Sequence, residues 1–95
     1  MALTLTGAEK RALRARGQLL ADTLRVGREG ASAAVVRELD RLLTARELVK
    51  IRFMDTDREQ RPTLADALAE ATQSACAGMV GHTALFYRPR PTGAE

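Results

Sequence analysis

The stretch LRVGREGASAAVVRELDRLL, residues 24–43, contains the patterns from which the fold is predicted. It begins with a short β-leaning run that ends at Val26, followed by a GxxG in which two glycines enclose Arg28 and Glu29. Ser32 is a suitable helix N-cap. After it, apolar residues recur at the spacing of one helical face: Val35, Val36, Leu39, Leu42 and Leu43. The stretch therefore predicts a strand at about 23–26, a loop and a helix.

Two other segments have the features of helices. Thr6 and Glu9 have the spacing of a capping box, which predicts a helix that runs to about Leu20. The residues of this helix that can face inward are Ala12 or Leu13, Gly17 and Leu20. A polar connection from residue 55 precedes a third helix, predicted to end at about Ser74. Its expected buried stripe consists of Leu64, Leu68, Ala71 and Ala75.

Strands are predicted on both sides of the third helix. The run ELVKIRFM, residues 47–54, alternates with period two, which is typical of a half-buried strand with one charged side. Its apolar side holds Val49, Ile51 and Phe53, and its charged side holds Lys50 and Arg52. The segment CAGMVGHTALFYRP, residues 76–89, predicts two short strands around Gly81 and His82. Glycine at the first central position suits a type II′ hairpin turn.

The predicted order of elements is α-β-α-β-α-β-β. Alternation of this kind favours an α/β fold in which helices pack on a four-stranded mixed sheet. A chain of 95 residues has the size of one compact domain. We predict that residues 1–91 form this domain and that residues 92–95 are a polar tail.

Composition and charge narrow the classes of function. No run approaches the ~18 apolar residues of a membrane span, and the start of the chain lacks the apolar region of a signal peptide. Together with a lone cysteine, Cys76, these features predict a cytoplasmic protein without membrane contact. The net charge of +3 is unevenly distributed. Residues 1–54 hold eleven Lys or Arg against six Asp or Glu, and residues 55–95 hold four against six.

The basic first half contains the GxxG, for which two explanations stay open. Glycine supplies positive φ in a strand-to-helix turn, but glycines at a helix start also let a phosphate approach free backbone amides. The role of the nearby cations also has two explanations. Lys10, Arg11 and Arg14 on the first helix are either solvated or hold an anion. Lys50 and Arg52 either project freely or snorkel from beneath a helix that covers their side of the sheet.

Patterns of catalytic chemistry are missing from the sequence. Neither GxxxxGK[ST] nor GxGxxG occurs, which argues against a nucleotide-binding enzyme loop. His82 is predicted in a surface turn, and Cys76 has no histidine near it in the sequence. The acids at positions 55, 57 and 59 lack the glycine and the distal glutamate of a calcium loop. We therefore predict no catalysis, no cofactor and no bound metal.

Three segments in this order carry a resemblance: LTGAEKRALRARG, LRVGREGASAAVVRELDRLLTARELVKIRF and DREQRPTLADALAEATQSACAGMVGHTALFYRP. The sequence from about Leu5 to Pro91 resembles the YhbY family of small bacterial proteins, which are single CRM-type (CRS1–YhbY) RNA-binding domains. The resemblance implies a fold similar to the C-terminal domain of translation initiation factor 3. It also implies binding to structured RNA, association with precursor large ribosomal subunits, and no catalysis.

The resemblance also assigns a site. The GxxG loop of the family falls on residues 27–30, its basic helix on residues 10–14, and its hairpin motif on residues 81–88. Many members carry lysine where this chain has His82, which would make a contact there pH-dependent. The predicted RNA-binding residues are Lys10, Arg11, Arg14, Arg16, Gly27, Arg28, Glu29, Gly30, Lys50, Arg52, His82 and Arg88.

We therefore predict a monomeric, non-catalytic protein that binds the rRNA of precursor large ribosomal subunits as an assembly factor. The alternative is a protein-interaction module that docks on a ribosomal or other protein through the acidic region 55–70. Salt dependence separates the two, because RNA binding through phosphate contacts weakens steeply as salt rises.

Overall fold

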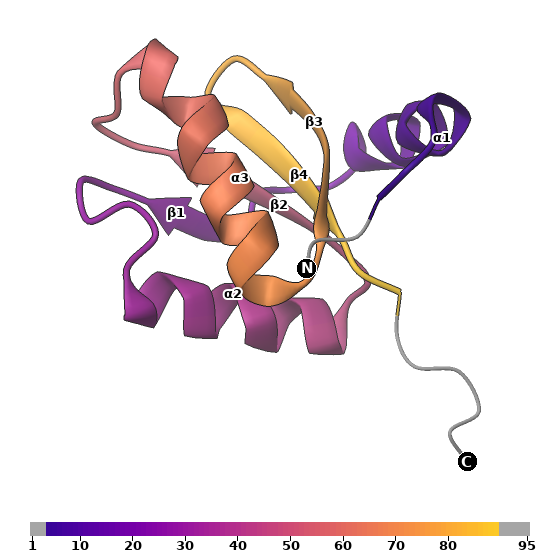
Figure 1. Cartoon of the computed structure of the whole chain (residues 1–95). Coiled ribbons are helices and arrows are strands. Elements are labelled where there is room, and N and C mark those ends of the chain that lie inside the picture. Colours follow the sequence, from indigo (N-terminus) through magenta and orange to yellow (C-terminus); the bar gives the residue numbers. More distant parts are fainter. Residues whose placement is uncertain (1–3, 90–95) are drawn as a thin grey trace.

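The helices and strands follow the predicted order (Figure 1). The computed structural model describes residues 4–89, so the predicted tail at 92–95 lies outside the described residues. The elements are α1 (Gly7–Gly17), β1 (Leu24–Val26), α2 (Ala33–Ala45), β2 (Leu48–Phe53), the 3-10 turn η1 (Arg58–Gln60), α3 (Arg61–Thr72), β3 (Ala75–Val80) and β4 (Thr83–Tyr87). The α/β prediction with a four-stranded mixed sheet is confirmed.

The strands form one sheet in the order β1-β2-β4-β3. β1 runs parallel to β2, with α2 as the crossover, and β4 pairs antiparallel with both β2 and β3. The two-residue turn between β3 and β4 has positive φ at Gly81, +57°, and not at His82, as a type II′ turn requires. The outer strand β3 contains a bulge, because the pairing with β4 shifts between Cys76 and Gly78.

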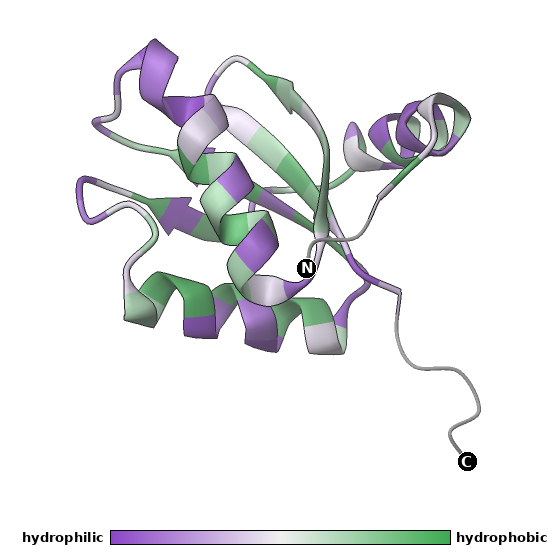
Figure 2. Ribbon diagram, in the orientation of Figure 1, coloured by the Kyte–Doolittle hydropathy of each residue, from purple (hydrophilic) through white to green (hydrophobic). Residues whose placement is uncertain are grey.

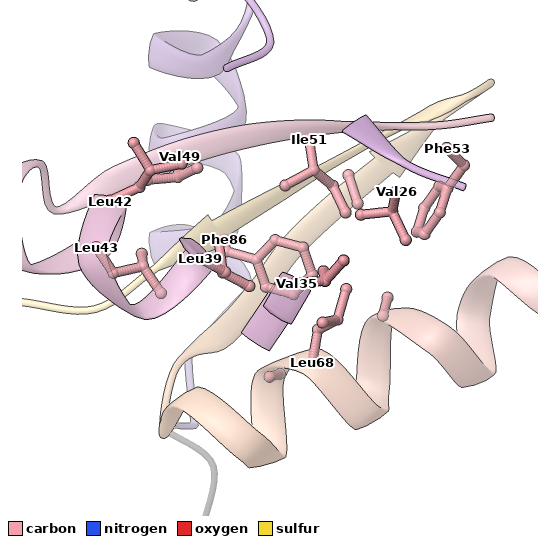
Figure 3. Packing of buried hydrophobic residues seen from close by; sticks show 13 residues of the cluster. Val26, Val35, Leu39, Leu42, Leu43, Val49, Ile51, Phe53, Leu68 and Phe86 are labelled. Atoms are coloured by element: carbon pink, nitrogen blue, oxygen red, sulfur yellow. The ribbon is translucent and has the colours of Figure 1, made fainter. Parts of the chain in front are cut away.

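The sheet is covered on both faces. α2 and α3 lie against one face, and the side chains from strands and helices point toward one another there (Figure 3). This main core includes Val26, Val35, Leu39, Leu43, Val49, Ile51, Phe53, Leu68 and Phe86. α1 lies on the opposite face over a smaller cluster formed by Leu13, Leu48, Ala77 and Leu85. The predicted alternation of β2 is therefore confirmed for its apolar side.

Local signals explain where the first two helices begin. Thr6 and Glu9 form the predicted capping box, with Thr6 N donating to Glu9 Oε1 at 2.8 Å and Glu9 N donating to Thr6 Oγ1 at 3.1 Å. Ser32 Oγ accepts a hydrogen bond from Val35 N at 3.2 Å and caps α2. Hydrophobic and hydrophilic residues alternate along α2, as its amphipathic pattern predicts (Figure 2).

α1 ends earlier than predicted, at Gly17 rather than Leu20. A Cβ on Gly17 would lie 2.6 Å from Leu85 Cδ2, so the helix contacts the sheet through its own backbone at this point. The chain then turns toward β1. As a result Leu20 is 38% exposed, and the prediction that it faces inward is wrong.

The predicted stripe of α3 is wrong at two positions. Ala71 is exposed, and Ala75 is buried but belongs to β3. The residues that α3 buries are Ala65, Leu68, Ala69 and Thr72. α3 ends at Thr72, because the next residue, Gln73, adopts a left-handed conformation with φ of 57°. β3 therefore begins at Ala75, before the position predicted from the sequence. Alanines on several sides of this helix make its buried face ambiguous in the sequence.

We expect the attachment of α1 to depend on Leu13, its one large side chain that is buried in the small cluster. Leu13→Ala should lower the free energy of unfolding by about 2–3 kcal/mol, because it removes buried methyl groups and leaves a cavity. Leu19→Ala makes the same chemical change at a position that is 89% exposed, and should change stability by about 0.5 kcal/mol or less. Urea unfolding of both variants is the measurement, and equal losses would contradict this account of how α1 is held.

Candidate nucleic-acid interface

The second glycine of the GxxG is required by the fold. Gly30 N donates a hydrogen bond to Gly27 O at 3.0 Å, which closes the loop. Gly30 has φ of +60°, and a Cβ there would lie 2.9 Å from Leu64 Cδ2 on α3. Both the positive φ and the contact with Leu64 disfavour a larger residue at this position. At Gly30, the turn explanation of the motif is sufficient.

The first glycine has no such structural reason. Gly27 does not have positive φ, and a Cβ there would meet only the side chain of Glu29, with Oε1 at 3.0 Å. Arg28 and Glu29 are both exposed. Position 27 is therefore open to a ligand once the Glu29 side chain moves, and its lack of a side chain suits close approach of another backbone.

Several loops meet at the end of the sheet that carries the GxxG. The carboxyl ends of the parallel strands β1 and β2 lie there, and Met54 N donates to Val26 O at 2.8 Å. The turn of the antiparallel hairpin reaches the same end, since Phe53 N donates to His82 O at 2.7 Å. Arg61 joins this turn to the loop after β2 by donating to Gly81 O at 3.1 Å and to Thr56 O at 3.4 Å. The exposed His82 thus lies at the same end as the loop.

A groove of about 320 Å³ separates α1 from the neighbouring part of the sheet. Its polar lining comes from α1, β2, β4 and the turn after α1, and consists of Arg14, Gln18, Lys50 and Thr83. The stem of Arg14 lies on β3, because a Cβ on Gly78 would be 2.5 Å from Arg14 Cδ. Lys50 is half-buried at this groove. The structure thus brings together two predicted site residues that are 36 positions apart in the sequence.

Arg52 lies beyond the part of β2 that α1 covers. It is exposed, and its Nε lies 3.6 Å from Asp22 Oδ2 in the segment before β1. The sequence left open whether a helix covers the charged side of this strand. Coverage is partial: α1 reaches Lys50 and leaves Arg52 at the surface.

The cations of α1 do not all line this groove. Arg14 and Arg16 are two positions apart and therefore project in different directions. Lys10 lines a separate groove of about 310 Å³ together with Asp66 and Glu70 of α3. Arg11 is exposed. Of the predicted basic helix, the structure places only Arg14 in the groove with Lys50.

Arg88 is located at the opposite end of the sheet. Its backbone N donates to Glu47 O at 2.9 Å, next to the start of β2. Its guanidinium donates to Asp40 Oδ1 at 2.6 Å, to Thr72 O at 2.7 Å and to Thr44 Oγ1 at 2.9 Å. Arg88 therefore connects β4 with α2 and α3, and its side chain is occupied by these internal partners.

The structure also brings an arginine to this region that the sequence analysis did not select. Arg25 in β1 lies directly beside Arg52 in β2, at the same height in the parallel register. It is exposed, while its neighbours Leu24 and Val26 face the main core. Alternation within β1 is the signal that could have identified it, but a three-residue strand is too short to make that signal clear.

Side chains suited to other chemistry are not gathered in the described part of the chain. Within residues 4–89, no three His, Cys, Asp or Glu side chains cluster as metal ligands would. Burial raises the pKa of the Cys76 thiol, which favours its protonated, unreactive form. Each helix in residues 4–89 is too short or too polar to span a membrane.

Fold and site together define a small α/β domain with a glycine loop at a helix start and cations on the sheet surface beside it. The CRS1/YhbY (CRM) domain model matches residues 5–88, and the chain belongs to this family. It is 30% identical over 84 residues to the probable RNA-binding protein YqeI of Bacillus subtilis, covering 88% of each chain.

A further relative and a solved structure are also similar to this chain. The chain is 38% identical over 88 residues to a probable RNA-binding protein of Methanocaldococcus jannaschii, covering 90% of this chain and 65% of that protein. The solution structure of the hypothetical protein SAV1595 from Staphylococcus aureus superposes with a TM-score of 0.84 at 28% identity. That match covers 95% of this chain and 94% of the other. The resemblance inferred from the three sequence segments is thereby confirmed.

The two glycines of the loop should respond differently to alanine. Gly30→Ala should lower the free energy of unfolding by about 1–2 kcal/mol, since a non-glycine residue with positive φ is strained, and contact with Leu64 adds to this cost. Gly27→Ala should leave stability unchanged or raise it by up to about 1 kcal/mol, because alanine restricts the unfolded chain. Thermal melting of both variants is the measurement. A large loss at Gly27 would show that the fold needs this glycine as well.

Proposed function

We propose that this protein is a non-catalytic RNA-binding protein that holds the phosphate backbone at the GxxG loop and at the groove between α1 and the sheet. The observation that carries the proposal is the position of Gly27: it is half-buried, only the side chain of Glu29 lies against it, the fold does not require it to be glycine, and exposed arginines lie beside it. Lys50 and Arg14 extend the positive surface into the groove. The names of the relatives in Bacillus subtilis and Methanocaldococcus jannaschii support RNA as the ligand.

The character of the surface favours phosphate contacts over base stacking. Proteins that bind unpaired bases stack them on exposed aromatic side chains. In this chain Phe53 and Phe86 are 2% and 0% exposed, and Tyr87 is half-buried against the α1 cluster. Arginine and lysine beside open glycine backbone can instead hold phosphate oxygens without reading sequence. RNA of different sequences should therefore bind with similar affinity.

We further propose that the bound RNA is rRNA of precursor large ribosomal subunits and that the protein acts there as a cytoplasmic assembly factor. The family resemblance supports this assignment. Sucrose-gradient sedimentation of a cell lysate tests it: the tagged protein should sediment with precursor large subunits at low salt and leave them as salt rises. A protein that binds purified RNA but stays at the top of the gradient at low salt would contradict the ribosomal role alone.

The loop can be tested by reversing its charge while both glycines are kept. R28D/E29D changes the local charge from zero to −2, which should weaken binding of a labelled RNA hairpin about tenfold, a loss of about 1.4 kcal/mol. The unfolding free energy should change by about 0.5 kcal/mol or less, because both side chains are exposed. Fluorescence anisotropy at one fixed salt concentration and thermal melting are the paired measurements.

The chain offers a matched control on the other side of the molecule. Arg37 and Glu38 in α2 repeat the same dipeptide on the solvent side of that helix, far from the groove of α1. R37D/E38D makes the same change in total charge and should reduce affinity by less than about twofold, since α2 packs on the face of the sheet opposite to α1 and its groove. Equal weakening by the two double variants would mean that only net charge matters and that the loop is no site.

A further inference from the structure

One corner of the sheet is left uncovered by α1, and the proposed contacts at the GxxG loop and the groove do not include it. Arg25 of β1 and Arg52 of β2 lie there side by side, on the face opposite the main core. Lys50 is two residues before Arg52 on the same side of β2, where the groove begins. The corner therefore joins the GxxG end of β1 to the groove beneath α1.

The cations of this corner are poorly neutralised. Neighbouring strands are about 4.8 Å apart, so two arginines in direct register place like charges close together. Asp22 contacts Arg52, but the 3.6 Å separation is longer than a charge-assisted hydrogen bond. No carboxylate in residues 4–89 forms an ion pair with Arg25. An anion placed between the two guanidinium groups would relieve their repulsion.

The corner is continuous with the open glycine. Gly27 directly follows the last residue of β1 and lies two residues beyond Arg25 in the chain. Two residues of extended chain span at most about 7 Å, so the two positions are close together. A nucleic-acid backbone that approaches Gly27 therefore passes over Arg25 if it continues along the sheet.

We infer that the RNA backbone crosses this corner, so that a single phosphate track runs from Gly27 over Arg25 and Arg52 to Lys50 and Arg14. The inference rests on the proposed function and adds Arg25 as a contact and Asp22 as a residue that competes with phosphate for Arg52. RNA is favoured over an acidic peptide because Arg25, Arg52 and Lys50 follow one another along and across two adjacent strands. Regularly spaced charge is the property of a phosphate backbone.

The test compares Arg25→Gln with Arg37→Gln, an equal change of charge on the outer side of α2. With a labelled RNA hairpin, Arg25→Gln should raise Kd about fivefold and should make the salt slope shallower by about one phosphate contact. Arg37→Gln should alter Kd by less than about twofold. Both variants should melt like the wild type, because both side chains are exposed.

A second variant tests the competition. Asp22→Asn removes the carboxylate that lies beside Arg52. The variant should lower the Kd for the RNA hairpin about two- to threefold, because one negative charge that repels phosphate is lost. Weaker binding by Asp22→Asn would instead show that the ion pair positions Arg52, and would overturn the competitor role.

The outcomes also separate this inference from the proposed function. A wild-type protein that fails to bind the hairpin refutes both. If the wild type binds and R28D/E29D weakens it, but Arg25→Gln behaves like Arg37→Gln, then the loop is a site and the track across the corner is refuted. If an acidic peptide displaces the hairpin from the wild type and loses its own binding in Arg25→Gln, the corner is a peptide site and the RNA track is likewise refuted.

Discussion

The close contact of α1 with the sheet is the constraint on which the candidate interface depends. Gly17 on the helix and Gly78 on β3 remove the two side chains that would hold these elements apart. Leu85 fills the space at Gly17, and the stem of Arg14 fills the space at Gly78. The helix is thereby fixed over one part of the face, and the depth of the groove and the exposure of the remaining corner both follow from its position.

The parallel pair of β1 and β2 supplies the second part of the arrangement. A parallel crossover returns the chain to the same end of the sheet, so the loop that enters α2 and the segment after β2 lie near each other. The hairpin of β3 and β4 adds its turn to this end. Backbone groups and cations that are far apart in the sequence can thus contact one extended ligand.

Most of the fold could be predicted because its signals are local. The Ser32 cap, the capping box at Thr6 and the alternation of β2 each depend on residues within a few positions of one another, and each is present in the structure. The face of α3 could not be predicted, because alanine is compatible with either a buried or an exposed position.

The candidate site was less predictable, since it depends on contacts between distant segments. Arg88 matches a family motif, but its partner Asp40 is 48 positions away, and only the folded structure brings them together. Lys10 and Arg14 look equivalent in the sequence, yet they line different grooves because they lie at different points along the same helix. Arg25 belongs to a strand of three residues, which is too short for an alternation of apolar and charged residues to show which side of the sheet Arg25 faces.

The bulge in β3 has a consequence for how copies of this chain meet one another. β3 is an outer strand of the sheet, and an outer strand with regular spacing is a template on which a strand of another molecule can pair. The extra residue between Cys76 and Gly78 interrupts that spacing, and the stem of Arg14 lies across the strand at the same place. This edge of the sheet is therefore a poor template for pairing with a strand of another copy of the chain.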